Sequence, residues 1–188
     1  MTAAQVLVWI VGPVVLLVCC VLALTSGREP RTAAGLAGVV PLAAGGLALA
    51  FHVGVPAPDP ALASVMTVLM SVLGVVGGGP ATAVVLRLAT HRDATPGRNG
   101  GILILDQRGD GQRHEVLRGG AAIGHLERIA VVAAILVSRL EIVAAVIAIK
   151  GLGRFSELDS AEARERFIIG TLASMLWAGA FAALVALA

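Results

Sequence analysis

Apolar residues along this chain gather into runs of about 20, separated by short polar turns and one longer polar stretch. The first two runs cover 6–24 and 33–53, and a third begins at Asp59 and continues to about Leu88. As helices, runs of this length cross a hydrocarbon core of about 30 Å. A bilayer leaves no water to satisfy backbone polar groups, so spanning segments are helices or closed barrels. The pattern therefore predicts three transmembrane helices in residues 1–88.

Prolines, glycines and one aspartate predict where these helices begin and bend. Asp59 is a candidate N-cap, and Pro60 suits the first helical position. Pro41 is expected to bend the second helix. The third would be about 42 Å long, and Gly77-Gly78-Gly79-Pro80 is expected to break it near its far end. This break is either plain helix packing or an unwound stretch that binds a ligand.

Residues 89–118 form the one long polar stretch, which is expected to be a cytoplasmic loop. Within it, Gly101–Gln107 and Gln112–Leu117 carry apolar residues on either side of Asp110-Gly111, a pair typical of a tight hairpin turn. The loop is therefore expected to contain a β-hairpin.

The last third, 119–188, is either two or three spans, depending on whether 119–155 is one helix or a hairpin. One continuous helix would be about 55 Å long and would place Arg139 and Glu141 near the bilayer centre. Each buried charge would cost about 2.5–3.5 kcal/mol. A hairpin bent at Ser138–Glu141 places both charges at the outer surface, with limbs of about 30 Å and 24 Å. The final span begins at Arg166.

The distribution of basic residues favours the hairpin. With six spans and an outside N-terminus, 13 of the 14 Lys and Arg residues face the cytoplasm, and only Arg139 lies outside. The cytoplasmic ones are Arg28, Arg31, Arg87, Arg92, Arg98, Arg108, Arg113, Arg118, Arg128, Lys150, Arg154, Arg164 and Arg166. With five spans the count falls to nine of 13, and Arg139 stays in the membrane. Because cytoplasmic loops of membrane proteins are enriched in Lys and Arg, we predict an all-α protein of the cytoplasmic (inner) membrane with six transmembrane helices and both termini outside.

Composition supports the membrane assignment and narrows the partners. The chain is 57% apolar and 14% charged, whereas soluble domains carry about 25% charged residues. Residues 1–5 lack the Lys or Arg of a secretory signal, which favours a retained first span. The basic residues do not gather beside aromatic ones, so no nucleic-acid partner is expected. The adjacent Cys19 and Cys20 have no metal-ligand spacing, and no cofactor or metal is expected.

Charged residues gather at the predicted cytoplasmic ends of the last three helices. The candidate cluster consists of Glu127, Arg128, Lys150, Arg154 and Arg166. Lys150 and Arg154 are four apart and share a helix face. We expect Glu127 to pair with one of them, because charges at a membrane edge pair or extend towards water. The cluster is either a set of structural pairs or a site for a ligand or ion. His125 is either a packed histidine or a proton relay.

Three ordered segments in this region resemble a known family. Gly119–Arg128 contains Ile-Gly-x-Leu-Glu-Arg, 149–158 contains Lys-x-x-x-Arg-Phe-x-Glu, and 165–174 contains Ile-Gly-Thr-Leu-x-Ser. Residues 119–180 are similar to a family of bacterial integral membrane proteins of unknown function. Met1–Leu24 lacks the His and Asp found in the first helix of that family. The resemblance implies a shared helical membrane architecture and no particular activity.

The sequence leaves more than one class of function open. No nucleophile elbow, metal-ligand set or other catalytic motif occurs, so an enzyme is not expected. We favour a non-catalytic protein that packs against itself or another membrane protein, through small-residue faces at Gly120, Gly124, Gly170 and Ser174. The alternative is a small transporter or channel with an ion or solute site near Glu127 and Lys150. The first three spans carry few polar side chains, which speaks against a solute path.

Overall fold

A computed structural model describes residues 3–25, 32–54, 56–89, 103–105, 113–115, 120–155 and 161–187. These residues form a helical bundle with two short strands. The helices are α1 (Ala3–Thr25), α2 (Thr32–Ala37), α3 (Val39–Ala50), α4 (Pro60–Val76), α5 (Gly78–Ala89), α6 (Gly120–Leu136), α7 (Leu140–Phe155) and α8 (Ala161–Leu187). The strands are β1 (Leu103–Leu105) and β2 (Arg113–Glu115).

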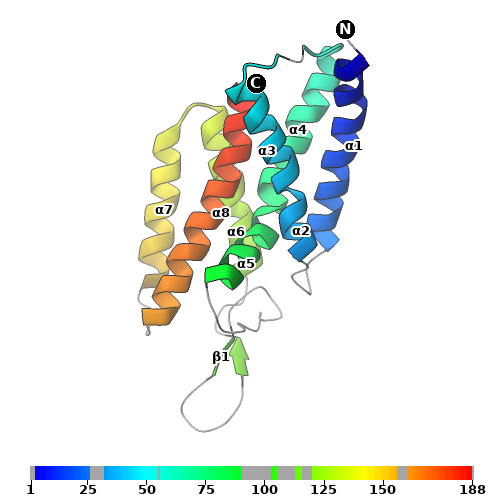
Figure 1. Cartoon of the computed structure of the whole chain (residues 1–188). Coiled ribbons are helices and arrows are strands. Elements are labelled where there is room, and N and C mark those ends of the chain that lie inside the picture. The colour runs from blue at the N-terminus through cyan, green and yellow to red at the C-terminus, as the bar shows by residue number, and fades with distance from the viewer. Residues whose placement is uncertain are drawn as a thin grey trace.

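The bundle is arranged around α8. This helix packs against α3, α4, α5 and α6, while α1 packs against α4 and α7 packs against α6 (Figure 1). The start of α1 and the end of α8 lie at one end of the bundle, and β1 lies beyond the other. We call the end that carries β1 the β end. Successive helices run in alternating directions between the two ends, with α2 and α3 together making one passage and α4 and α5 another (Figure 1).

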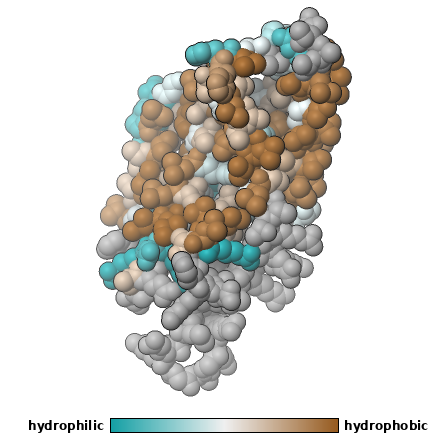
Figure 2. All heavy atoms as spheres, viewed as in Figure 1, coloured by the Kyte–Doolittle hydropathy of each residue, from teal (hydrophilic) through white to brown (hydrophobic). Residues whose placement is uncertain are grey.

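The outer surface of the bundle is strongly apolar. Hydrophobic residues cover most of the visible face, and hydrophilic ones gather near its two ends, most clearly at the β end (Figure 2). Within the described residues, two stretches are each long and apolar enough to cross a membrane, Gln5–Thr25 and Ala163–Leu187. The bent pair α4–α5 adds a third if it counts as one span. This outward display of apolar side chains suits a helical protein that associates with a membrane.

Among the described residues, buried side chains form two clusters, and both include α8. The first joins α1, α4, α5 and α8, and consists of Leu16, Cys19, Cys20, Leu73, Ala81, Trp177 and Phe181. The rings of Trp177 and Phe181 lie 5.2 Å apart, and the Trp177 Nε1–H donates to the Leu73 carbonyl at 3.3 Å. The second cluster joins α6 and α8, and α7 adds only the partly buried Val143 and Val146. No side chain of α7 that the structure describes is fully buried.

The second apolar run is broken in the structure. It divides at Gly38 into α2 and α3, one turn before Pro41. A proline within a helix lacks the N–H that would bond the carbonyl four residues earlier, here that of Ala37. The Cys19 thiol instead lies 3.4 Å from this Ala37 carbonyl oxygen. The run is therefore interrupted at Gly38, one turn before Pro41, where the bend was predicted.

The third apolar run begins and breaks where the sequence predicts. Asp59 has an extended backbone, and its carboxylate accepts a hydrogen bond from the Ala61 N–H at 2.6 Å, with Pro60 in the first turn. This is an N-cap with its proline in the preferred position. The chain then bends by 43° between α4 and α5, at Gly77.

Residues 120–155 form two antiparallel helices and not one. The Arg139 N–H donates to the Ala134 carbonyl at 2.7 Å, and the Ser138 N–H to the Ile135 carbonyl at 3.0 Å. Ser138 has φ 56°, the left-handed conformation that ends a helix in this hydrogen-bond pattern. Arg139 and Glu141 both lie exposed at the turn, their side chains 3.3 Å apart.

The two strands lie in the polar stretch where the sequence predicts a hairpin. They pair antiparallel, with Leu103 opposite Glu115 and Leu105 opposite Arg113. Asp110 and Gly111, the predicted turn, lie outside the described residues.

Candidate functional site

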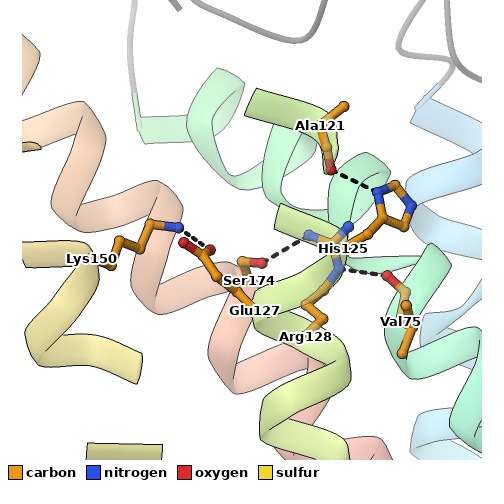
Figure 3. Close-up of polar contacts among 7 residues, drawn as sticks. All are labelled: Val75, Ala121, His125, Glu127, Arg128, Lys150 and Ser174. Carbon is orange, nitrogen blue, oxygen red and sulfur yellow. Dashed lines mark hydrogen bonds and ion pairs between the residues drawn. The ribbon is translucent and has the colours of Figure 1, made fainter. Parts of the chain in front are cut away.

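Helix α6 sends two neighbouring charged residues to opposite surroundings. Consecutive residues of an α-helix point about 100° apart. Arg128 therefore turns towards α4, α5 and α8, while Glu127 turns towards α7 (Figure 3). The sequence predicts one charged cluster, whereas the structure gives Arg128 and the Glu127–Lys150 ion pair separate surroundings.

The guanidinium of Arg128 is enclosed by three helices. The residue is 5% exposed, and its Nε–H donates to the Val75 carbonyl at 2.5 Å. Its Nη1 donates to the Ser174 hydroxyl oxygen at 3.1 Å (Figure 3). Val75 is in the last turn of α4, where helix carbonyls lack intrahelical donors. The arginine thus joins the end of α4 to α8 and supplies a donor at the helix break.

Two glycines make room for this arginine. A Cβ added at Gly78, the first residue of α5, would collide with the Arg128 side chain at Cδ. A Cβ added at Gly124 would lie 3.2 Å from Arg128 Nη1. Gly124, predicted as part of a helix-packing face, therefore leaves space for an arginine four residues along its own helix.

The partners of Arg128 are neutral oxygens. Among the residues that the structure describes, no carboxylate forms an ion pair with it. Burying a charge is costly unless hydrogen bonds replace its hydration, and hydrogen bonds to charged groups are stronger than neutral ones. Since arginine does not lose its proton in proteins, Arg128 is suited to holding helices together and unsuited to proton transfer.

Glu127 forms the ion pair expected from the sequence, and its partner is Lys150. The Lys150 ammonium donates to Glu127 Oε2 and joins α6 to α7 (Figure 3). The side chain of Glu127 is 10% exposed and that of Lys150 is 18% exposed, so the pair is mostly shielded from solvent. The same ammonium lies 5.9 Å from the centre of the Phe167 ring on α8, within the range of a cation–π contact. Lys150 therefore links the peripheral α7 to both of its neighbours.

The other predicted residues have separate environments. Arg154 lies on α7, but its side chain is outside the described part of the chain. Arg166 is partly buried on α8. His125 bonds within its own helix, where its Nδ1 lies 2.7 Å from the Ala121 carbonyl oxygen (Figure 3). Gly120 is partly buried at the start of α6.

Gly170 and Ser174 lie one turn apart on α8 and serve different neighbours. A Cβ at Gly170 would lie 3.6 Å from side-chain atoms of Thr82 and Leu86, so this position packs against α5 as expected of a small residue. Ser174 is buried and contributes its hydroxyl to Arg128.

Sequence reasoning missed two partners in this region. The Val75 carbonyl is a backbone group and has no signature of its own, although the nearby Gly77–Pro80 break indicates unsatisfied carbonyls. Phe167 follows the basic residues of α8 directly, and an aromatic next to a predicted charged cluster is a usable signal for a cation–π contact.

No protein-family model, no curated protein and no solved structure matches the chain. The resemblance of 119–180 to a bacterial membrane family stays a prediction. Among the described residues, no group of three or more His, Cys, Asp or Glu side chains is arranged to hold a metal ion.

Proposed function

We propose that the chain is a multi-pass protein of the cytoplasmic membrane, with six spans and both termini outside, that acts without catalysis. It packs against a second copy of itself or against another membrane protein, as an assembly or accessory subunit. The family resemblance of 119–180 agrees with this architecture.

The alternating helix directions and the charge distribution support the membrane arrangement. In this orientation the β end, where α7 ends and α8 begins (Figure 1), faces the cytoplasm. Lys150 lies in the last two turns of α7, and Arg164 lies in the first turn of α8. The hydrophilic residues near that end adjoin the apolar middle of the bundle (Figure 2). The shorter α6 and α7, of 17 and 16 residues, are each about 25 Å long, which is enough to cross most of the hydrocarbon core of a bilayer.

One observation carries the proposal of a packing role: the ionisable groups on α6 already serve contacts between helices. Arg128 joins α6 to α4 and α8, and Glu127 joins α6 to α7. These groups therefore connect helices within the chain, and the apolar outer surface of the bundle is the part that remains to bind a second protein.

Helix α7 is the best candidate for the recognition surface. It lies at the edge of the bundle and has no fully buried side chain among those described. Its outward residues include Ile142, Ile149 and Leu152, of which Ile149 is 72% exposed. A helix attached at so few points gains support from a neighbouring protein.

Cysteine crosslinking in native membranes tests this role. In a Cys19→Ala, Cys20→Ala background, we expect Ile149→Cys on α7 to form a crosslinked dimer or a crosslink to a second membrane protein. Leu7→Cys is the matched control, because Leu7 is 62% exposed and belongs to α1, which lies across the bundle from α7 (Figure 1). A monomer alone at Ile149→Cys, with no partner retained after mild detergent extraction, would overturn the proposal.

The bent α4–α5 pair favours a second candidate, a small transporter or channel with an ion or solute site near Glu127 and Lys150. Interrupted helices form the binding sites of many transporters, and Arg128 lies at this interruption. Ion or solute flux in proteoliposomes that is abolished by Glu127→Gln would support this candidate over the packing role.

A further inference from the structure

An open groove of about 230 Å³ runs between α7 and α8 near the β end of the bundle. Its walls are almost wholly apolar, with Ile147 on the α7 side and Ile168 and Leu172 on the α8 side. Helix α7 packs against α6 and leaves this gap to α8. Gly151 on α7 and Thr171 on α8 also line the groove, and small residues of this kind let membrane helices approach closely. The two walls thus suit direct helix packing, which α7 in its observed position does not make.

Helix α7 is attached differently at its two ends. Val143 and Val146, in its first half, pack against the buried cluster of α6 and α8. Among the described residues beyond Val146, Lys150 is the one whose side chain is hydrogen-bonded to another helix, through the Glu127 carboxylate. The end of α7 that borders the groove is therefore held mainly by one ion pair, and the opposite end by apolar packing.

The turn before α7 provides a pivot. The chain reverses there between α6 and α7, Ser138 adopts φ 56°, and the side chains of Arg139 and Glu141 are exposed. Hinges in proteins are a few loop or element-terminal residues that absorb changes in φ and ψ. A tilt of α7 about this turn displaces its far end most, and that end borders the groove.

We propose that α7 is a hinged strap that closes over the groove, and that the Glu127–Lys150 ion pair holds it open. In the closed position Ile147 packs against the α8 wall. Lys150 moves away from Glu127 towards the Phe167 ring, whose centre already lies 5.9 Å from its ammonium. Van der Waals packing between the helices favours closure, while the loss of a charge-assisted hydrogen bond opposes it.

Closure regulates the recognition surface proposed for α7. Ile149 is two residues from Ile147 and so points about 200° away from it, on the side opposite the groove. When α7 tilts into the groove, this surface is drawn inward with it. A partner that packs against Ile149 therefore binds one position of α7 better than the other and shifts the balance between them. This regulatory role rests on the proposed packing function, whereas the movement itself does not.

Disulfide formation across the groove tests the closure. In a chain with Cys19 and Cys20 replaced by alanine, Gly151→Cys is combined with Ile168→Cys, since the two positions lie on opposite sides of the groove. A Cβ at Gly151 meets no atom within 4 Å in the open position, whereas the two Cβ atoms of a disulfide are typically about 3.8 Å apart. A bond between these positions within one chain is therefore favoured only on closure.

The rate of this disulfide in oxidant-treated membranes reports how often α7 closes. Glu127→Gln should raise the rate about tenfold, because a hydrogen bond to a charged group contributes that factor or more. Lys150→Met should do the same, and adding it to Glu127→Gln should give no further increase, since both remove one ion pair. Arg139→Gln, which removes an exposed charge at the turn, should leave the rate unchanged. Each rate is measured below the unfolding temperature of its variant.

Gly153→Cys with Ile168→Cys is the matched control pair. A Cβ at Gly153 also meets no atom within 4 Å, but Gly153 does not line the groove, so this pair should form no disulfide. Equal rates in the two pairs would indicate general loosening of α7 and would overturn the proposal. A rate across the groove that Glu127→Gln leaves unchanged would overturn it as well.

The outcome is separable from that of the packing function. The disulfide lies within one chain, so it is read on the monomer and needs no partner. If it responds to Glu127→Gln but Ile149→Cys captures no partner, the packing function fails and the hinged strap stands. If Ile149→Cys captures a partner but the disulfide does not respond, the hinged strap alone is overturned.

Discussion

At the scale of single residues, the contact between Arg128 and the break after α4 explains why small residues occur at three nearby positions. Gly78 and Gly124 leave space for the arginine side chain, and Ser174 supplies an acceptor without bulk. Each contact depends on a close approach of α6 to the junction of α4 and α5. The glycines at 77–79 are therefore not equivalent to one another.

Alanine substitutions at two adjacent glycines test this difference. Gly78→Ala places a methyl group against the Arg128 side chain and should destabilise the protein by about 1–3 kcal/mol, the range for overpacking. Gly79→Ala meets no atom within 4 Å, and should be neutral or stabilising by up to about 1 kcal/mol through helix propensity. Thermal unfolding of both variants in detergent measures the effects. Equal loss in both would show that Arg128 does not fill the space beside Gly78.

The neighbours Glu127 and Arg128 also show how far sequence reasoning reached at this scale. The pairing of Glu127 with Lys150 was predictable, because an unpaired charge near a membrane is costly and opposite charges at adjoining helix ends therefore tend to pair. The burial of Arg128 was not, because it depends on how α6 is rotated about its axis. The sequence of α6 places apolar residues on several sides and so does not define that rotation.

At the scale of secondary-structure elements, the ion pair is the polar tie that holds α7 to α6. Among the described residues, α7 is also attached through the packing of Val143 and Val146 and the contact of Lys150 with Phe167. The position and orientation of α7 therefore depend strongly on Glu127 and Lys150.

A double-mutant cycle tests whether this tie is structural. Glu127→Gln should lower the unfolding temperature in detergent, because Lys150 loses its partner in a shielded site. The loss in free energy of unfolding should stay below the roughly 3–5 kcal/mol that breaking a fully buried ion pair costs. Adding Lys150→Met should recover much of it, since both charges are then absent. Unchanged stability in both single variants would mean that the two side chains do not meet.

The turn between α6 and α7 offers an independent test of the hairpin. Ser138 adopts φ 56°, a conformation that costs residues with a Cβ about 1–2 kcal/mol and costs glycine little. Ser138→Gly should therefore raise stability by about 1 kcal/mol. Ser71→Gly in the middle of α4 is the control and should lower it by a similar amount. A loss of stability in Ser138→Gly would contradict the left-handed turn.

Helix existence was easier to predict than helix continuity. Runs of apolar residues indicated every long helix, and Asp59-Pro60 indicated where α4 begins. The division of the second run at Gly38 was less visible, because Pro41 was expected to bend the helix and not to end it. Gly38 lies against the ring of Trp177, since a Cβ there would come within 2.6 Å of it. That contact comes from α8, more than a hundred residues away, and no local pattern reveals it.

At the scale of the whole molecule, the proposed arrangement in the membrane rests on where the charges lie relative to the two ends of the bundle. Cysteine substitutions at Ala57, Gly100 and Ser156, in a background with Cys19 and Cys20 replaced by alanine, report the side on which each segment lies. Ala57 follows the passage of α2 and α3, whereas Gly100 and Ser156 follow passages that end at the β end.

Because Lys and Arg are enriched at the β end and cytoplasmic loops favour them, a membrane-impermeant thiol reagent should label Ala57→Cys on intact cells. Gly100→Cys and Ser156→Cys should react only after permeabilisation, and the background protein should not react at all. Labelling of Ser156→Cys from outside would place the end of α7 on the wrong side and overturn the six-span arrangement, since α7 would then not return through the membrane.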